Sequence, residues 1–202
     1  IFDECTSGFR ATFGGLHLKY GVNPDIAVLG KALGNGYAIT TVLGTQEVMT
    51  ASQSSFISST FFTERIGYVA ALATLDEMER LKSWEIISQK GASFKNRIMS
   101  ISKKYNLELD VTGMDALVVY NFKQIDALAA KTYISQEMLK EGFLAGNNFY
   151  PSIAHSEKET EYFFSALEKV FKKSNIISEE IEEDRRGDCA TLCYWKNGIQ
   201  ST

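Results

Sequence analysis

The stretch DIAVLGKALGNG, residues 25–36, decides the fold class. Its first five residues form an apolar run that follows an Asn-Pro turn signal, which predicts a buried strand ending at Gly30. Residues 40–43 read Thr-Thr-Val-Leu before Gly44 and predict a second strand. Short strands separated by glycine turns, with polar groups at their ends, favour an α/β fold with a site at the sheet edge. We expect the sheet within residues 1–60 to be parallel.

The rest of the chain predicts a second, smaller α/β unit. Residues 66–75 are apolar on nearly every face and predict a buried helix. Apolar side chains at helical spacing predict helices through 94–105 and 130–138, and residues 116–120 predict a strand. Ser156 followed by Glu159 forms a capping box that predicts the start of the last helix.

These patterns divide the chain into three parts. We predict a first α/β unit over residues 1–79 and a second, smaller unit over residues 80–175. Residues 176–202 hold most of the net negative charge and predict an acidic linker or tail.

Composition excludes several classes of protein. With 45% hydrophobic and 12% aromatic residues the 202-residue chain is not intrinsically disordered. No apolar run approaches the roughly 20 residues of a membrane helix, and no signal peptide is visible. The net charge of −4 argues against nucleic acid as a partner. Three cysteines are too few for a disulfide scaffold, so we expect a reducing compartment, the cytoplasm.

The sequence predicts no metal site. Cys189 and Cys193 are spaced C-x3-C, but His17 and His155 are the only histidines that can join them.

Arg10 can bind a carboxylate, but a surface or interface ion pair is the expected role.

Lys31 is the first candidate functional residue. It follows the predicted buried strand and is enclosed by Gly30 and residues 34–36. Burial favours the neutral form of an amine, which can form a Schiff base, and glycines let a flat ligand approach the backbone. The alternative is a solvated lysine. A phosphate-binding loop is excluded, because Ile26 and Ala32 stand where that motif needs Gly and Ser or Thr.

Asp3 is the second candidate. It follows Ile1-Phe2, which predicts the last half of a buried strand, and α/β sheets place ligand-binding groups at strand ends. A carboxylate there can bond a protonated ring nitrogen, although a turn or helix-cap acid is the alternative. Natural domains seldom begin inside a strand, so we expect this chain to be a fragment of a longer protein that is inactive by itself.

Three segments, taken together, resemble the class III pyridoxal-phosphate aminotransferases: DECTSGFR at 3–10, GVNPDI at 21–26 and GKALGNG at 30–36. The run SSTFFTERIG at 58–67 is similar to the glutamate-1-semialdehyde aminotransferase/aminomutase-like subgroup. The resemblance covers about residues 1–80 and continues more weakly to about 173. It implies the PLP-dependent transferase fold type I, in which residues 1–79 are the C-terminal part of the large PLP-binding domain and residues 80–175 are the small C-terminal α/β domain.

The resemblance also implies roles for four residues. Lys31 matches the lysine that holds pyridoxal 5'-phosphate as a Schiff base, and Asp3 matches the acid that pairs with its pyridinium nitrogen. Cys5 stands where the family usually has Val, packed on the ring face. Thr60 matches a threonine that reaches the cofactor phosphate of the other subunit in a homodimer. Residues 63–65 depart from the Gly-Asn-Pro of many members, which puts the local loop shape in question but not Thr60.

The implied function is amino-group transfer between a small-molecule amino donor and a carbonyl acceptor. Lys31 would move the proton between the substrate carbon and the cofactor carbon. An intramolecular aminomutase is one alternative. A non-catalytic binding or structural homologue is the other, although such a protein needs neither Lys31 nor Asp3.

Overall fold

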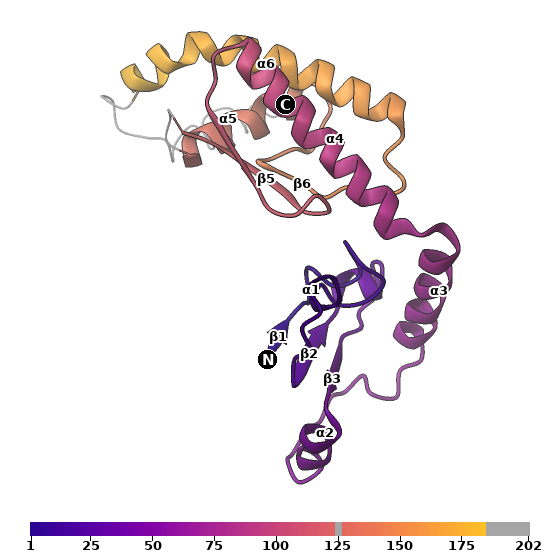
Figure 1. Ribbon diagram of the computed structural model, residues 1–202. Helices are drawn as coiled ribbons and strands as arrows, with labels where there is room; N and C mark the ends of the chain where they lie inside the picture. Colours follow the sequence, from indigo (N-terminus) through magenta and orange to yellow (C-terminus); the bar gives the residue numbers. More distant parts are fainter. Residues whose placement is uncertain (124–126, 185–202) are drawn as a thin grey trace, which may run out of the picture. The chain divides into compact units, whose positions relative to one another are not determined.

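The computed structural model describes residues 1–123 and 127–184, which form two compact units (Figure 1). The first unit is discontinuous and comprises Ile1–Ala92, Met114–Leu117 and Tyr150–Ile153. The second comprises Ser93–Gly113, Val118–Phe149 and the described residues from Ala154 onward. Each unit has its own three-stranded sheet and its own hydrophobic core. The predicted domain boundaries after residues 79 and 175 stay predictions.

The sheet of the first unit has the strand order β1 (Phe2–Asp3), β2 (Ile26–Leu29) and β3 (Thr41–Gly44). β1 is parallel to β2, but β3 is antiparallel to it. The expectation of a wholly parallel sheet is therefore wrong for β3. Parallel neighbours need a crossover of a dozen or more residues, and residues 30–40 are too short for one.

The core of the first unit lies between β2 and α3 (Ile66–Leu81). Ala27 and Leu29 of β2 are buried, as are Ala71 and Met78 of α3. The short helices α1 (His17–Tyr20) and α2 (Gln46–Ser52) contribute no buried residue.

Helix α3 is confirmed as a helix, but the expectation that its apolar start is buried on every side is wrong. Gly67, Ala71 and Met78 are buried. Only one face of α3 packs against the core of the first unit. The apolar side chains on its other faces are not covered by any of the described residues. The exposed side chains are those of Ile66, Tyr68, Val69 and Leu72.

Arg10 binds two segments of the first unit that lie far from it in the sequence, Met114–Leu117 and Tyr150–Ile153. Its Nη2 donates to the carbonyl oxygens of Ala116 at 2.8 Å and Pro151 at 2.7 Å. Burial lowers the pKa of the Arg10 guanidinium. The expected ion pair is wrong, because this side chain is partly buried against backbone carbonyls.

The second unit has an antiparallel sheet in the order β4 (Leu109–Thr112), β5 (Val118–Phe122) and β6 (Asn148–Phe149). Every second residue of β5 is buried, and this face packs against the apolar sides of three helices. These helices are α4 (Ser83–Lys104), which begins in the first unit, α5 (Ala127–Lys140) and α6 (Glu157–Asp184). The predicted helical stripes supply this core with Phe94, Ile98, Ile101, Ala130, Ile134, Met138, Leu167 and Val170.

The capping box at the start of α6 is confirmed. The backbone N–H of Glu159 donates to Ser156 Oγ at 3.2 Å, and the N–H of Ser156 donates to Glu159 Oε2 at 2.9 Å. Helix α6 extends to Asp184 and so includes the first part of the predicted tail. Residues 185–202 of that tail lie outside the described residues.

No helix in the described part of the chain is both long and apolar enough to cross a membrane. Within residues 1–123 and 127–184, no group of three or more His, Cys, Asp or Glu side chains is placed to hold a metal ion. Cys189 and Cys193 lie outside these ranges.

Candidate active site

Asp3 and Lys31 lie at the same edge of the first sheet. Asp3 is the last residue of β1, and Gly30 and Lys31 follow directly after β2. Because β1 and β2 are parallel, with Asp3 paired to Val28, the carboxyl ends of both strands meet at this edge. Both side chains are exposed there. The sheet thus brings together two candidate residues that are far apart in the sequence.

Lys31 is exposed, contrary to the expectation of burial, because the chain turns away from the sheet at Gly30. It begins the 3-10 turn η1 (Lys31–Leu33) with a φ of 43°, in the left-handed region. The backbone N–H groups of Gly34 and Asn35 donate to its carbonyl oxygen at 3.2 and 3.1 Å. Such strain costs about 1–3 kcal/mol, persists only where neighbours impose it, and clusters at functional sites. The turn therefore fixes the backbone from which the Lys31 side chain extends.

Cys5 lies within electrostatic reach of both residues. Its backbone N–H donates to Asp3 Oδ1 at 3.0 Å. Burial and then the Asp3 carboxylate raise the pKa of the Cys5 thiol, while the charge of Lys31 acts in the opposite direction. The thiol is therefore protonated at neutral pH and a weak nucleophile. A reactive role is therefore not expected for Cys5, and its packing on the cofactor ring stays a prediction.

Thr6 joins these residues in the structure. Its Oγ1 accepts a hydrogen bond from Nζ of Lys31. No sequence pattern points to Thr6, because a threonine in a glycine-containing turn is common and belongs to no motif. The contact depends on the pairing of β1 with β2, which no local pattern encodes.

No sequence pattern points to Glu4 either, yet only 5% of its surface is exposed. Its carboxylate accepts hydrogen bonds from the backbone N–H groups of Leu16 and His17, the latter at 3.0 Å. The same carboxylate lies 2.9 Å from Nδ1 of His17. Its own N–H donates to the carbonyl oxygen of Val28 at 2.8 Å. Glu4 therefore fixes the backbone on which Asp3 stands.

Glu4→Gln is expected to lower the free energy of unfolding by about 1–3 kcal/mol. The amide nitrogen would face a backbone N–H that now donates to a carboxylate oxygen, which leaves a buried donor without an acceptor. Urea unfolding of the protein measures the change. Glu79→Gln, at an exposed position of α3, is the matched control and is expected to change stability by less than about 0.5 kcal/mol. Equal midpoints for the two variants would contradict the role of Glu4.

A pocket of about 460 Å³ opens beside Lys31. One wall comes from residues 37–40 and another from Ser59, Phe61 and Phe62, in the segment between α2 and α3. The Tyr68 hydroxyl donates to the carbonyl oxygen of Phe62 at 3.1 Å. The volume suits a small-molecule site.

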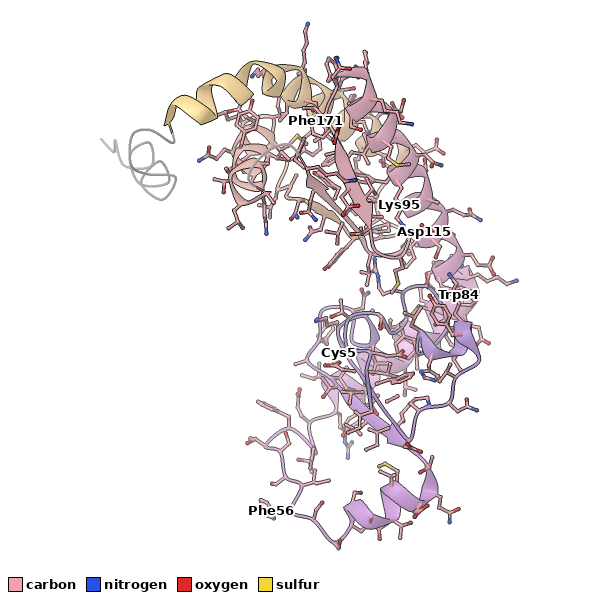
Figure 2. All side chains as sticks on the ribbon, turned by 60° about the vertical axis from the view of Figure 1, so that its left-hand side comes forward. Cys5, Phe56, Trp84, Lys95, Asp115 and Phe171 are labelled. Carbon is pink, nitrogen blue, oxygen red and sulfur yellow. The ribbon has the colours of Figure 1, made fainter. Side chains whose placement is uncertain are left out.

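Thr60 lies in the segment between α2 and α3. Its side chain is exposed and does not line the pocket, although its two neighbours do. Figure 2 shows Phe56, from the same segment, well away from Cys5. The structure places Asp3, Cys5 and Lys31 at one edge of the sheet, and the expected contact of Thr60 with the cofactor of a second subunit stays a prediction.

The sequence also matches a known protein family. The family model for class-III aminotransferases matches residues 1–171. The chain belongs to the class-III aminotransferases. The match includes Asp3, Cys5, Lys31 and Thr60 within one family domain.

Curated relatives of this class-III chain include both transfer enzymes and mutases. It is 31% identical over 173 residues to 3-aminobutyryl-CoA aminotransferase of Cloacimonas acidaminovorans, covering 83% of this chain and 42% of that protein. It is 30% identical over 179 residues to glutamate-1-semialdehyde 2,1-aminomutase of Bdellovibrio bacteriovorus, covering 80% of this chain and 42% of that protein. The chain thus spans less than half the length of these relatives.

Solved structures confirm the predicted fold. The FumI protein of Sphingopyxis sp. MTA144, in its PLP internal aldimine form, superposes with a TM-score of 0.77 at 23% identity. The match covers 92% of this chain and 44% of the FumI chain. The class-III chain therefore has the mixed α/β fold of PLP-dependent transaminases and contains part of it.

Proposed function

We propose that this chain carries the lysine of a PLP-dependent active site that transfers amino groups. The observation that supports the proposal is that Asp3 and Lys31 both lie at the carboxyl ends of two adjacent parallel strands. In open α/β sheets, ligands generally bind at the carboxyl ends of the strands. Membership of the class-III aminotransferases supports the choice of reaction.

The residues at this edge fit pyridoxal 5'-phosphate. An amine suits the aldehyde carbon of the cofactor, and a carboxylate suits its pyridine nitrogen. Lys31 and Asp3 supply these two groups, and the neutral thiol of Cys5 adds a small, mostly apolar surface beside them. When bound, the cofactor provides an electron sink for the substrate carbon that loses a proton.

Each residue then has a defined task. Lys31 would hold the cofactor through its amine. Once released, this amine would take the proton from the substrate carbon that bears the amino group, carry it on Nζ as an ammonium, and give it back to carbon. Proton transfer of this kind contributes roughly 10²–10⁴ in rate. Asp3 keeps the ring nitrogen protonated, which requires a charged acceptor.

The proposed substrates are a small-molecule amino donor and a carbonyl acceptor, in an enzyme similar to the glutamate-1-semialdehyde subgroup. The segment 58–67 and the aminomutase relatives support the subgroup, and the 3-aminobutyryl-CoA aminotransferase relative supports transfer between two molecules. An intramolecular aminomutase is the second candidate. Turnover that requires a separate keto acid or aldehyde favours transfer, whereas turnover without an added acceptor favours the mutase.

Borohydride reduction tests the role of Lys31. The holoenzyme that contains this chain is reduced with sodium borohydride, digested and mapped by mass spectrometry. The cofactor mass is expected on the peptide that contains Lys31. A label on another lysine, or no label, would overturn the proposed function, and the absence of a label is what a non-catalytic homologue predicts.

We further propose that Thr60 serves a second copy of the protein in a homodimer. Thr60 does not line the pocket beside Lys31 in its own chain, and the exposed rings of Phe61 and Phe62 flank it. Exposed apolar clusters of this kind are typical of interfaces.

Mixing two inactive variants tests the shared site. A heterodimer of Lys31→Ala and Thr60→Ala subunits has one site without both groups and one intact site. Random assortment is expected to restore roughly a quarter of the wild-type activity. No recovery in a sample where mass spectrometry detects heterodimers would contradict a site shared between subunits.

A further inference from the structure

We propose that Thr6 is a positioning residue for the amine of Lys31. Its hydroxyl bonds Nζ of Lys31 and holds the amine at the sheet edge whenever that amine is free. This inference rests on the proposed function, because it assumes that Lys31 acts through its amine.

The hydroxyl of Thr6 stands on a tightly held turn. The N–H of Cys5 donates to Asp3 Oδ1 at 3.0 Å, and the N–H of Gly8 donates to the carbonyl oxygen of Glu4 at 2.8 Å. A Cβ on Gly8 would lie 2.6 Å from Cδ2 of Leu29, so the turn packs directly on β2. Thr6 therefore presents its oxygen at a fixed place beside the strand that leads to Lys31.

Lys31 needs such a support, because its side chain is long and flexible. Its backbone is fixed by the turn at a φ of 43°, but the side chain is exposed and has four rotatable methylene groups. Within residues 1–123 and 127–184, Thr6 is the hydrogen-bond partner of Nζ. Without this bond the amine would sample many rotamers, and misplacement of a reacting group by about 1 Å can cost on the order of 10² in rate.

A hydroxyl suits an amine that gains and loses a proton. It accepts a hydrogen bond from the ammonium form and can donate one to the neutral form, whereas a carboxylate can only accept. Thr6 can therefore hold Lys31 before and after a proton moves. Asp3, at the same edge, remains available for a different partner.

The test measures the reactivity of Lys31 without the cofactor. Cofactor-free protein is treated with acetic anhydride at low conversion, and mass spectrometry gives the acetylation of Lys31 relative to exposed Lys19. A hydrogen bond donated by the ammonium stabilises the protonated form of Lys31, and one accepted by the neutral amine occupies its lone pair. Both therefore lower the reactivity of the amine with the anhydride. Thr6→Val keeps the shape but removes the hydroxyl, and is expected to raise the ratio about fivefold, the factor of one net hydrogen bond. Thr6→Ser is expected to keep the wild-type ratio.

A second pair covers the case in which valine disturbs the turn. Thr6→Ala and Thr6→Ser are both smaller than threonine and differ from each other by the hydroxyl alone. A higher ratio in Thr6→Ala than in Thr6→Ser supports the inference, and equal ratios overturn it. In the holoenzyme, Thr6→Val is expected to lower kcat about tenfold with KM of the amino donor nearly unchanged, because the amine is displaced while binding groups remain.

The two proposals fail separately. A borohydride label on Lys31 together with equal acetylation ratios overturns the positioning role and leaves the proposed function standing. A borohydride label on another lysine overturns the proposed function whatever the acetylation ratios are.

Discussion

Lys31→Ala is expected to lower turnover by about 10⁴-fold while leaving the first unit folded. The variant removes both the group that holds the cofactor and the group that moves the proton. The exposed side chain packs in neither hydrophobic core, so its loss opens no cavity. Alanine also has a Cβ, so the strain at a φ of 43° is the same in both proteins. Steady-state kinetics and thermal unfolding of the holoenzyme measure the two quantities.

Two further variants isolate the role of the amine. Lys31→Arg keeps the positive charge, but a guanidinium does not release a proton near neutral pH, so this variant is expected to be as inactive as Lys31→Ala. Lys19→Ala, at another exposed lysine, is expected to retain wild-type turnover. A Lys31→Arg enzyme with substantial activity would show that Lys31 supplies charge and does not move a proton.

Local patterns predicted the parts of the fold that depend on neighbours in the sequence. The apolar run before Gly30 forms β2, and the Ser156–Glu159 capping box starts α6. Asp3 and Lys31 could be chosen from sequence because each stands at the end of such a run. Their meeting at one edge follows from the parallel pairing of β1 with β2.

The parts that could not be predicted depend on contacts between distant segments. Thr6 reaches Lys31 through strand pairing, and Glu4 is buried because Leu16 and His17, at the start of α1, fold over it. Arg10 finds its acceptors more than a hundred residues away. The start of α3 is apolar all round, but apolarity alone does not say which face a neighbour covers.

Asp3→Asn is expected to lower turnover by about 10²-fold with partial retention of cofactor binding. A hydrogen bond to a charged partner is roughly twice as strong as a neutral one, and an amide cannot hold the proton on a ring nitrogen. Asparagine keeps an Oδ1 atom, which can still accept the N–H of Cys5 that now donates at 3.0 Å. The turn that carries Thr6 should therefore persist, and the loss should come from the missing charge.

Three measurements separate this chemical effect from a structural one. Turnover of Asp3→Asn gives its size, and Asp25→Asn, an exposed acid just before β2, is the control with near wild-type turnover. The acetylation ratio of Lys31 in cofactor-free Asp3→Asn reports whether the Thr6 contact survives, and we expect it to stay close to wild type. The ¹⁵N shift of cofactor labelled at the ring nitrogen is expected to move to the value of the unprotonated ring. Near-normal turnover with an unprotonated ring would mean that the charge of Asp3 is dispensable, and the edge of β1 would then lose its proposed part in the reaction.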